Sequence, residues 1–140
     1  NDPVKGTELT KAQISQGADV VYAAAGGTGV GVLQAAADAD ILSIGVDANQ
    51  NYMHPGQVLT SMLKRVDLAV YNAFSEGESL TTGFNIMGLA EDGVGYALDE
   101  YNESLVNAQM ISTLETEKAK IVNGQIKVHD YMSDNNCPVK

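Results

Sequence analysis

The chain has 140 residues, with 8 Lys or Arg against 18 Asp or Glu, which gives a net charge of −10 at pH 7. This length fits one domain of ordinary size, and a hydrophobic content of 44% supports a core and argues against a disordered tail. The acidity argues against nucleic acid or an anionic membrane as a partner, because such a surface repels phosphate groups. One cysteine and two histidines argue against a disulfide framework or a metal centre, so we expect no metal and no cofactor.

The first half of the chain alternates between helical and strand patterns. We predict helices over residues 3–16 and 30–38, and buried strands over residues 19–25, 41–46 and 58–63. The glycine-rich run Gly26–Gly31 forms a tight turn between the first strand and the second helix. A strand, glycine turn, helix and strand make a βαβ unit with parallel strands. The fold class is therefore α/β, a parallel sheet with helices on both faces.

The second half of the chain gives weaker patterns. A polar loop over residues 47–56 precedes the third strand, and an amphipathic helix over 66–74 follows it. Further along we expect a strand within 80–89, a strand over 94–98 beside it as a hairpin, a long helix over 102–121 that Ser104 could cap, and a short strand over 125–128.

The glycine turn and Asp47 lie where ligands bind in α/β proteins, at the carboxyl ends of parallel strands. The turn lacks the Gly-Lys-Ser/Thr of a Walker loop, and Val32 stands where a dinucleotide-binding motif has its third glycine. Asp47 nevertheless lies about 20 residues after the first glycine of that motif, the spacing typical of an acid that binds a ribose. A turn that only needs positive φ and binds nothing is the alternative.

Asp47 and Lys64 are the candidate polar groups. A carboxylate accepts hydrogen bonds from two neighbouring hydroxyls, although Asp47 could instead cap the following loop. Lys64 follows the third strand and by itself reads as a surface charge. No Gly-x-Ser-x-Gly motif is present, Cys137 lies in a polar tail with no base near it in the sequence, and His54 reads as an ordinary loop histidine. The pattern favours binding over catalysis, so we expect that the protein is not an enzyme.

Several segments together resemble the basic membrane protein family, the substrate-binding components of bacterial ABC importers. Many members of this family are specific for purine nucleosides. The resemblance covers most of the chain and is most specific at the glycine turn and after the second strand. The matching segments are residues 2–6, 17–29, 44–50 and 61–64, with Gly77, Gly88–Leu89 and Gly93–Gly95.

The resemblance implies a periplasmic-binding-protein type I fold, with two lobes that close over a ligand. On this basis residues 1–60 and 80–140 belong mainly to the second, C-terminal lobe. Residues 61–79 cross a hinge and place a helix on the first lobe, most of which would lie upstream of Asn1. The implied partners are the N-terminal half of the same protein and an ABC permease. The implied location is periplasmic or lipid-anchored outside the cell membrane.

The resemblance also assigns the site. Backbone groups of Gly26 and Gly27, the Asp47 carboxylate and the Lys64 ammonium would hold a ribose, while rings of the missing half would stack on the purine. Asn49 stands where many members carry a second Asp, which leaves the identity of the nucleoside, base or other ring system open. Two alternatives remain: a nucleotide-linked enzyme, against which Val32 argues, and a sensor domain built on the same fold.

Overall fold

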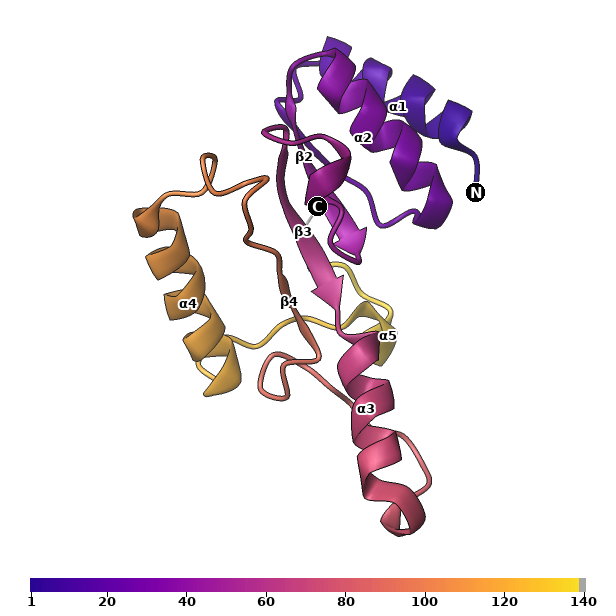
Figure 1. Ribbon diagram of the computed structural model, residues 1–140, viewed down its shortest axis with the longest axis vertical. Coiled ribbons are helices and arrows are strands. Elements are labelled where there is room, and N and C mark those ends of the chain that lie inside the picture. The colour runs from indigo at the N-terminus through magenta and orange to yellow at the C-terminus, as the bar shows by residue number, and fades with distance from the viewer. Residues whose placement is uncertain (139–140) are drawn as a thin grey trace.

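The computed structural model describes residues 1–138. The strands are β1 (Val20–Tyr22), β2 (Leu42–Asp47), β3 (Val58–Lys64) and β4 (Val94–Tyr96). The helices are α1 (Pro3–Ser15), α2 (Gly29–Asp38), α3 (Val66–Glu76), α4 (Ala108–Val122) and α5 (Tyr131–Asp134), with 3₁₀ turns η1 (Gly26–Thr28), η2 (Asn51–Met53) and η3 (Gly77–Ser79). Within the described residues the sheet has two helices, α1 and α2, on one side and α4 on the other, while α3 extends away from it (Figure 1).

The described strands form one sheet in the order β1-β2-β3-β4. β1, β2 and β3 run parallel, and β4 is antiparallel to β3. The predicted βαβ unit is therefore confirmed, with α2 as the crossover between β1 and β2. The register places Asp47 beside Leu63, so the last residues of β2 and β3 lie at the same edge of the sheet.

The first two helices pack together at one end of the molecule (Figure 1). Pro3 occupies the first turn of α1, and the Asp2 carboxylate caps that helix by accepting a hydrogen bond from the Lys5 N–H at 3.0 Å. Gly31 lies so close to the Pro3 carbonyl that a Cβ at this position would not fit. This close approach lets α2 lie against α1 on one side and bury Val32 and Ala36 against β1 on the other.

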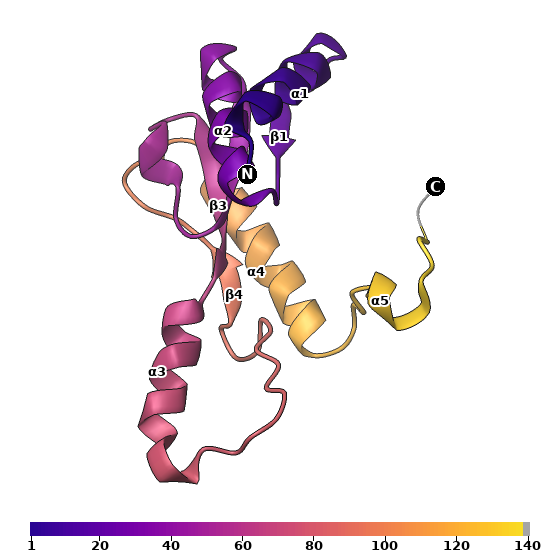
Figure 2. The same ribbon diagram turned by 90° about the vertical axis from the view of Figure 1, so that its right-hand side faces the viewer.

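Helix α3 extends away from the sheet, at the opposite end from α1 and α2 (Figures 1 and 2). None of its described residues is buried, and the Phe74 side chain is 83% exposed. Val66, Val70 and Tyr71 are also exposed on this helix. An apolar stripe of this kind on an extended helix is typical of a surface that packs against another part of a protein. No helix within residues 1–138 combines the length and apolar character needed to cross a bilayer.

The predicted hairpin is wrong. Residues 80–88 form no strand, and Phe84 and Ile86 are almost fully solvent-exposed because the described chain offers them no neighbouring strand. β4 pairs instead with β3, which supplies a free edge. The strand predicted over residues 125–128 is likewise absent, since this segment also lacks a partner edge.

The long helix begins later than predicted. α4 starts after Asn107, whose side chain accepts a hydrogen bond from the Met110 N–H, so Asn107 rather than Ser104 is the cap. Asn102 does not join the helix because its side-chain amide donates to the Leu59 and Ala97 carbonyls. The Leu59 carbonyl lies 43 residues earlier in the chain, so tertiary hydrogen bonds keep Asn102 outside the helix.

Candidate ligand-binding site

Asp47 and Lys64 form an ion pair at the carboxyl ends of two neighbouring parallel strands. Each is the last residue of its strand, β2 for Asp47 and β3 for Lys64, and Lys64 Nζ lies 2.7 Å from Asp47 Oδ1. The two side chains are 51% and 58% exposed. An ion pair this accessible to water contributes little to folding stability. The pair therefore presents a carboxylate and an ammonium group that a ligand can reach from solvent.

The backbone of Asp47 is strained. Its φ is +70°, in the left-handed region, and the Ala48 N–H donates to the Val46 carbonyl at 2.9 Å. This bond spans two residues and closes a γ-turn centred on Asp47, a conformation that is rare in proteins. Backbone strain of this kind persists only where the surrounding structure holds it, and it concentrates at functional sites.

Buried polar side chains hold the segment after Asp47. The Val46 N–H donates to Gln50 Oε1 at 2.9 Å, and the Gln50 N–H donates to Ser61 Oγ at 3.0 Å. Ser61 Oγ in turn donates to Asn51 Oδ1 at 2.8 Å. Ser61 and Asn51 are fully buried. The loop that leaves β2 is thus tied back to the middle of β3, which fixes the backbone on either side of Asp47.

The glycine turn has the predicted form. Gly26 has φ of +54°, which a glycine adopts without the steric penalty of a side chain. The Gly27 N–H donates to Asn1 Oδ1 at 2.9 Å, and the Asp2 N–H donates to Thr28 Oγ1 at 2.8 Å. The turn is therefore anchored to the segment that precedes α1, and one of its backbone donors is already used by Asn1.

The four predicted site residues fall into two pairs. Gly26 and Gly27 follow β1, and Asp47 ends the neighbouring parallel strand, so both lie on the carboxyl-end side of the sheet where ligands bind in this fold class. Within residues 1–138 no hydrogen bond or ion pair joins either glycine to Asp47 or Lys64.

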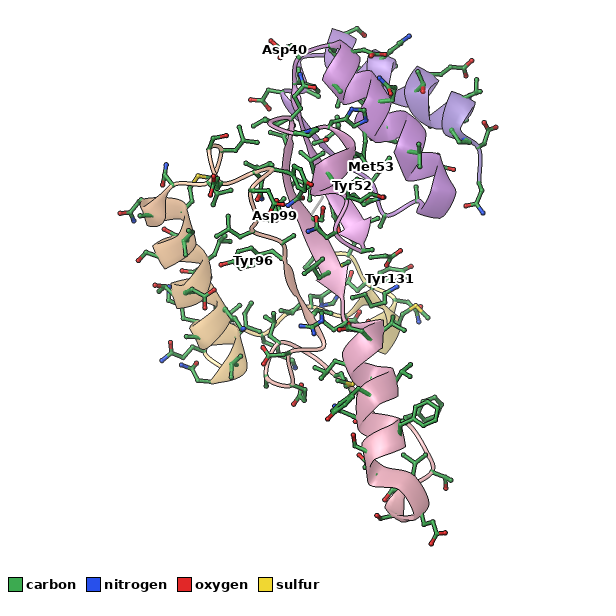
Figure 3. All side chains as sticks on the ribbon, viewed as in Figure 1. Asp40, Tyr52, Met53, Tyr96, Asp99 and Tyr131 are labelled. Carbon is green, nitrogen blue, oxygen red and sulfur yellow. The ribbon has the colours of Figure 1, made fainter. Side chains whose placement is uncertain are left out.

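Asp99 was not predicted from the sequence, yet it lies directly beside the loop after Asp47. Its Oδ2 accepts hydrogen bonds from Asn49 Nδ2 at 2.6 Å and from Asn51 Nδ2 at 3.1 Å. Figure 3 shows Asp99 next to the turn that carries Tyr52 and Met53. The hydrogen bond from Asn49 is the main cause that lowers the pKa of the Asp99 carboxyl below its usual value, and further bonds from Tyr101 and Asn51 add to it.

Sequence signals for this network exist, although they are weak. Ser61 follows Thr60 as a second polar residue between the apolar residues of the third strand, and Asn49 and Asn51 flank Gln50 in a short run of amide side chains. Such residues are often buried only where they find hydrogen-bond partners. The partner Asp99 lies 48 and 50 positions from these asparagines, too far along the chain for a local pattern to reveal.

A large hollow of the described chain lies elsewhere. It is an open groove of about 880 Å³ between the β3–β4 edge and α4, and none of the four predicted site residues lines it. α4 reaches the sheet through polar contacts, from Tyr96 Oη to Glu115 at 2.9 Å and from Lys118 to Asp92 at 3.3 Å. The lining of the groove is mainly apolar and includes Leu89, Leu98, Leu114 and Ile121. Asp47 and Lys64 stay the candidate ligand site, because a carboxylate and an ammonium group are the kind of groups that recognise hydroxyls.

Residues 1–131 match the family model described as "ABC transporter substrate-binding protein PnrA-like". Basic membrane protein D of Borreliella burgdorferi (strain JD1) is 37% identical over 127 residues, which cover 86% of this chain and 37% of that protein. An uncharacterized lipoprotein of Pyrococcus furiosus is 40% identical over 91 residues, covering 59% of this chain and 23% of the other. The chain thus spans well under half the length of these relatives.

Solved structures agree with the fold prediction. A solute-binding protein of an ABC transporter system from Aeropyrum pernix K1 superposes with a TM-score of 0.80 at 28% identity, over 92% of this chain and 45% of that one. A transcriptional activator of the comK gene from Bacillus halodurans gives a TM-score of 0.77 at 25% identity, with the same coverage. The predicted α/β architecture of the periplasmic-binding-protein type is confirmed.

Proposed function

This chain belongs to the PnrA-like, or basic membrane protein, family of ABC transporter substrate-binding proteins, and we propose that it forms most of one lobe of a receptor for a purine nucleoside. The receptor would deliver its ligand to an ABC permease. The observation that carries this proposal is the accessible Asp47–Lys64 pair at the ends of two parallel strands, on the same side of the sheet as the glycine turn.

The chemistry of the pair suits a ribose. The Asp47 carboxylate can accept hydrogen bonds from two neighbouring hydroxyls, and the Lys64 ammonium can donate to the same oxygens. Because the two charges already balance at 2.7 Å, a neutral sugar adds no uncompensated charge to the site. A phosphate group would instead meet Asp47 and the net charge of −10 of the chain. We therefore expect the receptor to prefer nucleosides over nucleotides.

The remainder of the receptor would cover the exposed apolar surfaces. On this proposal residues 1–60 and 80–140, of which 139 and 140 lie outside the described residues, form most of the second lobe, and residues 61–79 cross to the first lobe, the N-terminal half of the protein. α3, with Phe74 83% exposed, and the extended Phe84 and Ile86 would pack there. Lobes joined by such crossings close over a ligand by a hinge motion. The chain's coverage of less than half of its relatives supports this arrangement.

The location proposed is outside the cytoplasmic membrane, either free in a periplasm or anchored by a lipid. The Pyrococcus furiosus relative, whose name includes "lipoprotein", supports this placement. A binding role without catalysis fits the family. The second candidate function is a ligand-sensing domain of a regulator, which the likeness to the Bacillus halodurans transcriptional activator favours. A regulator would act inside the cell, so the location of the full-length protein separates the two candidates.

Ligand binding is tested by thermal unfolding of the full-length protein with adenosine, guanosine, inosine, free purine bases, ribose and nucleoside monophosphates. A ligand at about 100 times its Kd stabilises the folded state by roughly 2.7 kcal/mol, which gives a readily measured rise in Tm. We expect this rise with at least one nucleoside and a smaller one with the matching monophosphate and base. If no nucleoside raises the Tm at millimolar concentration, the nucleoside assignment is wrong.

The two-lobe arrangement has its own test. Residues 1–140 expressed alone should self-associate or capture a separately expressed N-terminal half, because α3 exposes an apolar face. Size-exclusion chromatography with native mass spectrometry measures this. Val70→Ser combined with Phe74→Ser should abolish the association, while Val4→Ser with Leu9→Ser, which replaces exposed apolar residues on α1, should leave it unchanged. A fragment that is monomeric and does not bind the N-terminal half would contradict the proposed packing of α3.

A further inference from the structure

We propose that Asp99 is a positioning residue of the binding site, which holds the Asp47 carboxylate in place through Asn49 and Asn51. The proposal rests on the proposed function, because it assigns Asp99 a role in the same ribose contact. It concerns two segments far apart in the sequence, the loop that follows β2 and the segment that follows β4. The structure joins them through one carboxylate.

The Asp99 carboxylate accepts three hydrogen bonds, from donors in the two segments. Oδ2 accepts from the side-chain amides of Asn49 and Asn51, and Oδ1 accepts from the Tyr101 N–H at 2.9 Å. Bonds from neutral donors to a carboxylate are stronger than those between two neutral groups. At 2.6 Å the bond from Asn49 is the shortest of the set. This bond fixes the chain two residues after Asp47.

Asp99 is itself held by the sheet. Its N–H donates to Asn102 Oδ1 at 2.9 Å, and the Asn102 amide donates to the carbonyls of Leu59 at 2.8 Å and Ala97 at 3.0 Å. Asn102 is fully buried, and Leu59 is the second residue of β3. The carboxylate is therefore a fixed point on the sheet and not the tip of a mobile loop.

A continuous path of hydrogen bonds leads from Asp99 to Val46, the residue before Asp47. Asp99 orients Asn51, whose Oδ1 accepts from Ser61 Oγ. The same hydroxyl accepts from the Gln50 N–H, and Gln50 Oε1 accepts from the Val46 N–H, one residue before Asp47. The γ-turn at Asp47 is strained and needs such support to persist. Removing the Asp99 charge should therefore loosen the turn and misplace the ribose-binding carboxylate.

The pairing of Asn49 with Asp99 allows an exchange of side chains as the test. Asp99→Asn leaves amide groups facing each other, and Asn49→Asp places two carboxylates against each other. The double variant Asn49→Asp/Asp99→Asn restores one carboxylate and one amide with no change in net charge. Asp38→Asn is the matched control, because the Asp38 carboxylate also accepts from a side-chain amide, that of Gln34 at 2.8 Å, at the far end of α2.

Affinity for the nucleoside identified by thermal unfolding is measured by calorimetry on the full-length protein. We expect each single variant to bind roughly 3- to 100-fold more weakly, the range of couplings between members of one hydrogen-bond network. The double variant should recover most of the loss, and Asp38→Asn should bind like the wild type. In an Asp47→Asn background, Asp99→Asn should have almost no further effect. Equal losses in both backgrounds, or wild-type affinity of Asp99→Asn, would overturn the proposal.

A second measurement needs no ligand. Amide hydrogen exchange, followed by NMR on the full-length protein, reports the protection of two N–H groups at the turn: that of Ala48, which closes it, and that of Val46, which donates to Gln50 Oε1. Both should exchange faster in Asp99→Asn, and the double variant should restore their protection. Unchanged protection in Asp99→Asn would refute the positioning role. If the wild-type protein binds no nucleoside, the proposed function is wrong. The hydrogen-exchange measurement then still shows whether Asp99 holds the turn at Asp47.

Discussion

Replacing Asp47 with Asn separates the binding role of this residue from its structural role. Asn adopts the left-handed backbone conformation more readily than most residues, so the φ of +70° at this position is retained. The variant loses the charge that pairs with Lys64 at 2.7 Å. Because both side chains are more than half exposed, loss of the pair should change the free energy of unfolding by less than about 1 kcal/mol.

The effect on binding should be much larger. A hydrogen bond to a charged group contributes about 1.5–3 kcal/mol, and each 1.4 kcal/mol is about a factor of ten in affinity. We therefore expect Asp47→Asn to weaken nucleoside binding roughly 10- to 150-fold in calorimetric titrations of the full-length protein. The same titrations with ribose-free purine base should show little difference between variant and wild type.

The chain provides a closely matched control in Asp92. This residue also has positive φ, +53°, and also forms an exposed ion pair, with Lys118 at 3.3 Å. It lies on the turn before β4, away from the Asp47–Lys64 pair. Asp92→Asn should leave nucleoside affinity unchanged. Wild-type affinity in Asp47→Asn, or an equal loss in Asp92→Asn, would refute the assignment of Asp47 to the ribose.

Three further predictions follow from the same geometry. Lys64→Met should weaken nucleoside binding in calorimetry while the free energy of unfolding in urea changes by less than about 1 kcal/mol; a large fall in stability would indicate a structural ion pair instead. Gly26→Ala should lower the free energy of unfolding by roughly 1–2 kcal/mol, because an L-residue is strained at φ of +54° and its Cβ would lie 3.0 Å from Asn1 Oδ1. Gly95→Ala is the control that should show no such loss, because there is open space where the Cβ at position 95 would lie. Hydrogen bonds lower the pKa of Asp99 from 3.8, so its ionised form stabilises the fold above that pH, and this contribution is lost as the pH falls through the lowered pKa. The difference in unfolding free energy between wild type and Asp99→Asn should therefore narrow from pH 6 to pH 3. A difference that stays constant over this range would contradict the prediction.

The part of the fold that a local pattern could predict is the part whose residues are buried by their near neighbours in sequence. β1, α2 and β2 form such a unit, in which Val21, Val32 and Ala36 pack on one another within a short stretch of chain. Asp47 could be predicted for the same reason, because it ends a strand of this unit. Strand ends and glycine turns leave a local signal, and chemistry at those places follows from the fold class.

The errors lie where the outcome depends on partners distant in sequence. Phe84 and Ile86 have the apolar character of a strand, but the described chain gives them no edge to pair with, and they remain exposed. Asn102 has helix-forming neighbours, yet its amide is used by the backbone of β3 and of the segment after β4. Asp99 shows the same limit at the site, because its asparagine partners belong to a loop about 50 residues earlier. Local patterns carry no information about such pairs.

The two-lobe proposal also explains why the candidate site combines a rigid backbone with exposed charges. In an open half-site, water molecules hydrogen-bond to Asp47 and Lys64 about as well as the hydroxyls of a sugar do, so the half-site alone binds a sugar weakly. When a second lobe excludes water, the local dielectric falls and the same hydrogen bonds strengthen. That gain requires the carboxylate to be in position before closure, since a mobile group would lose conformational entropy as the site closes. A strained turn held by buried amides and Asp99 meets this requirement, while the hinge supplies the movement. Rigidity within this lobe and motion between lobes are then complementary parts of one binding mechanism.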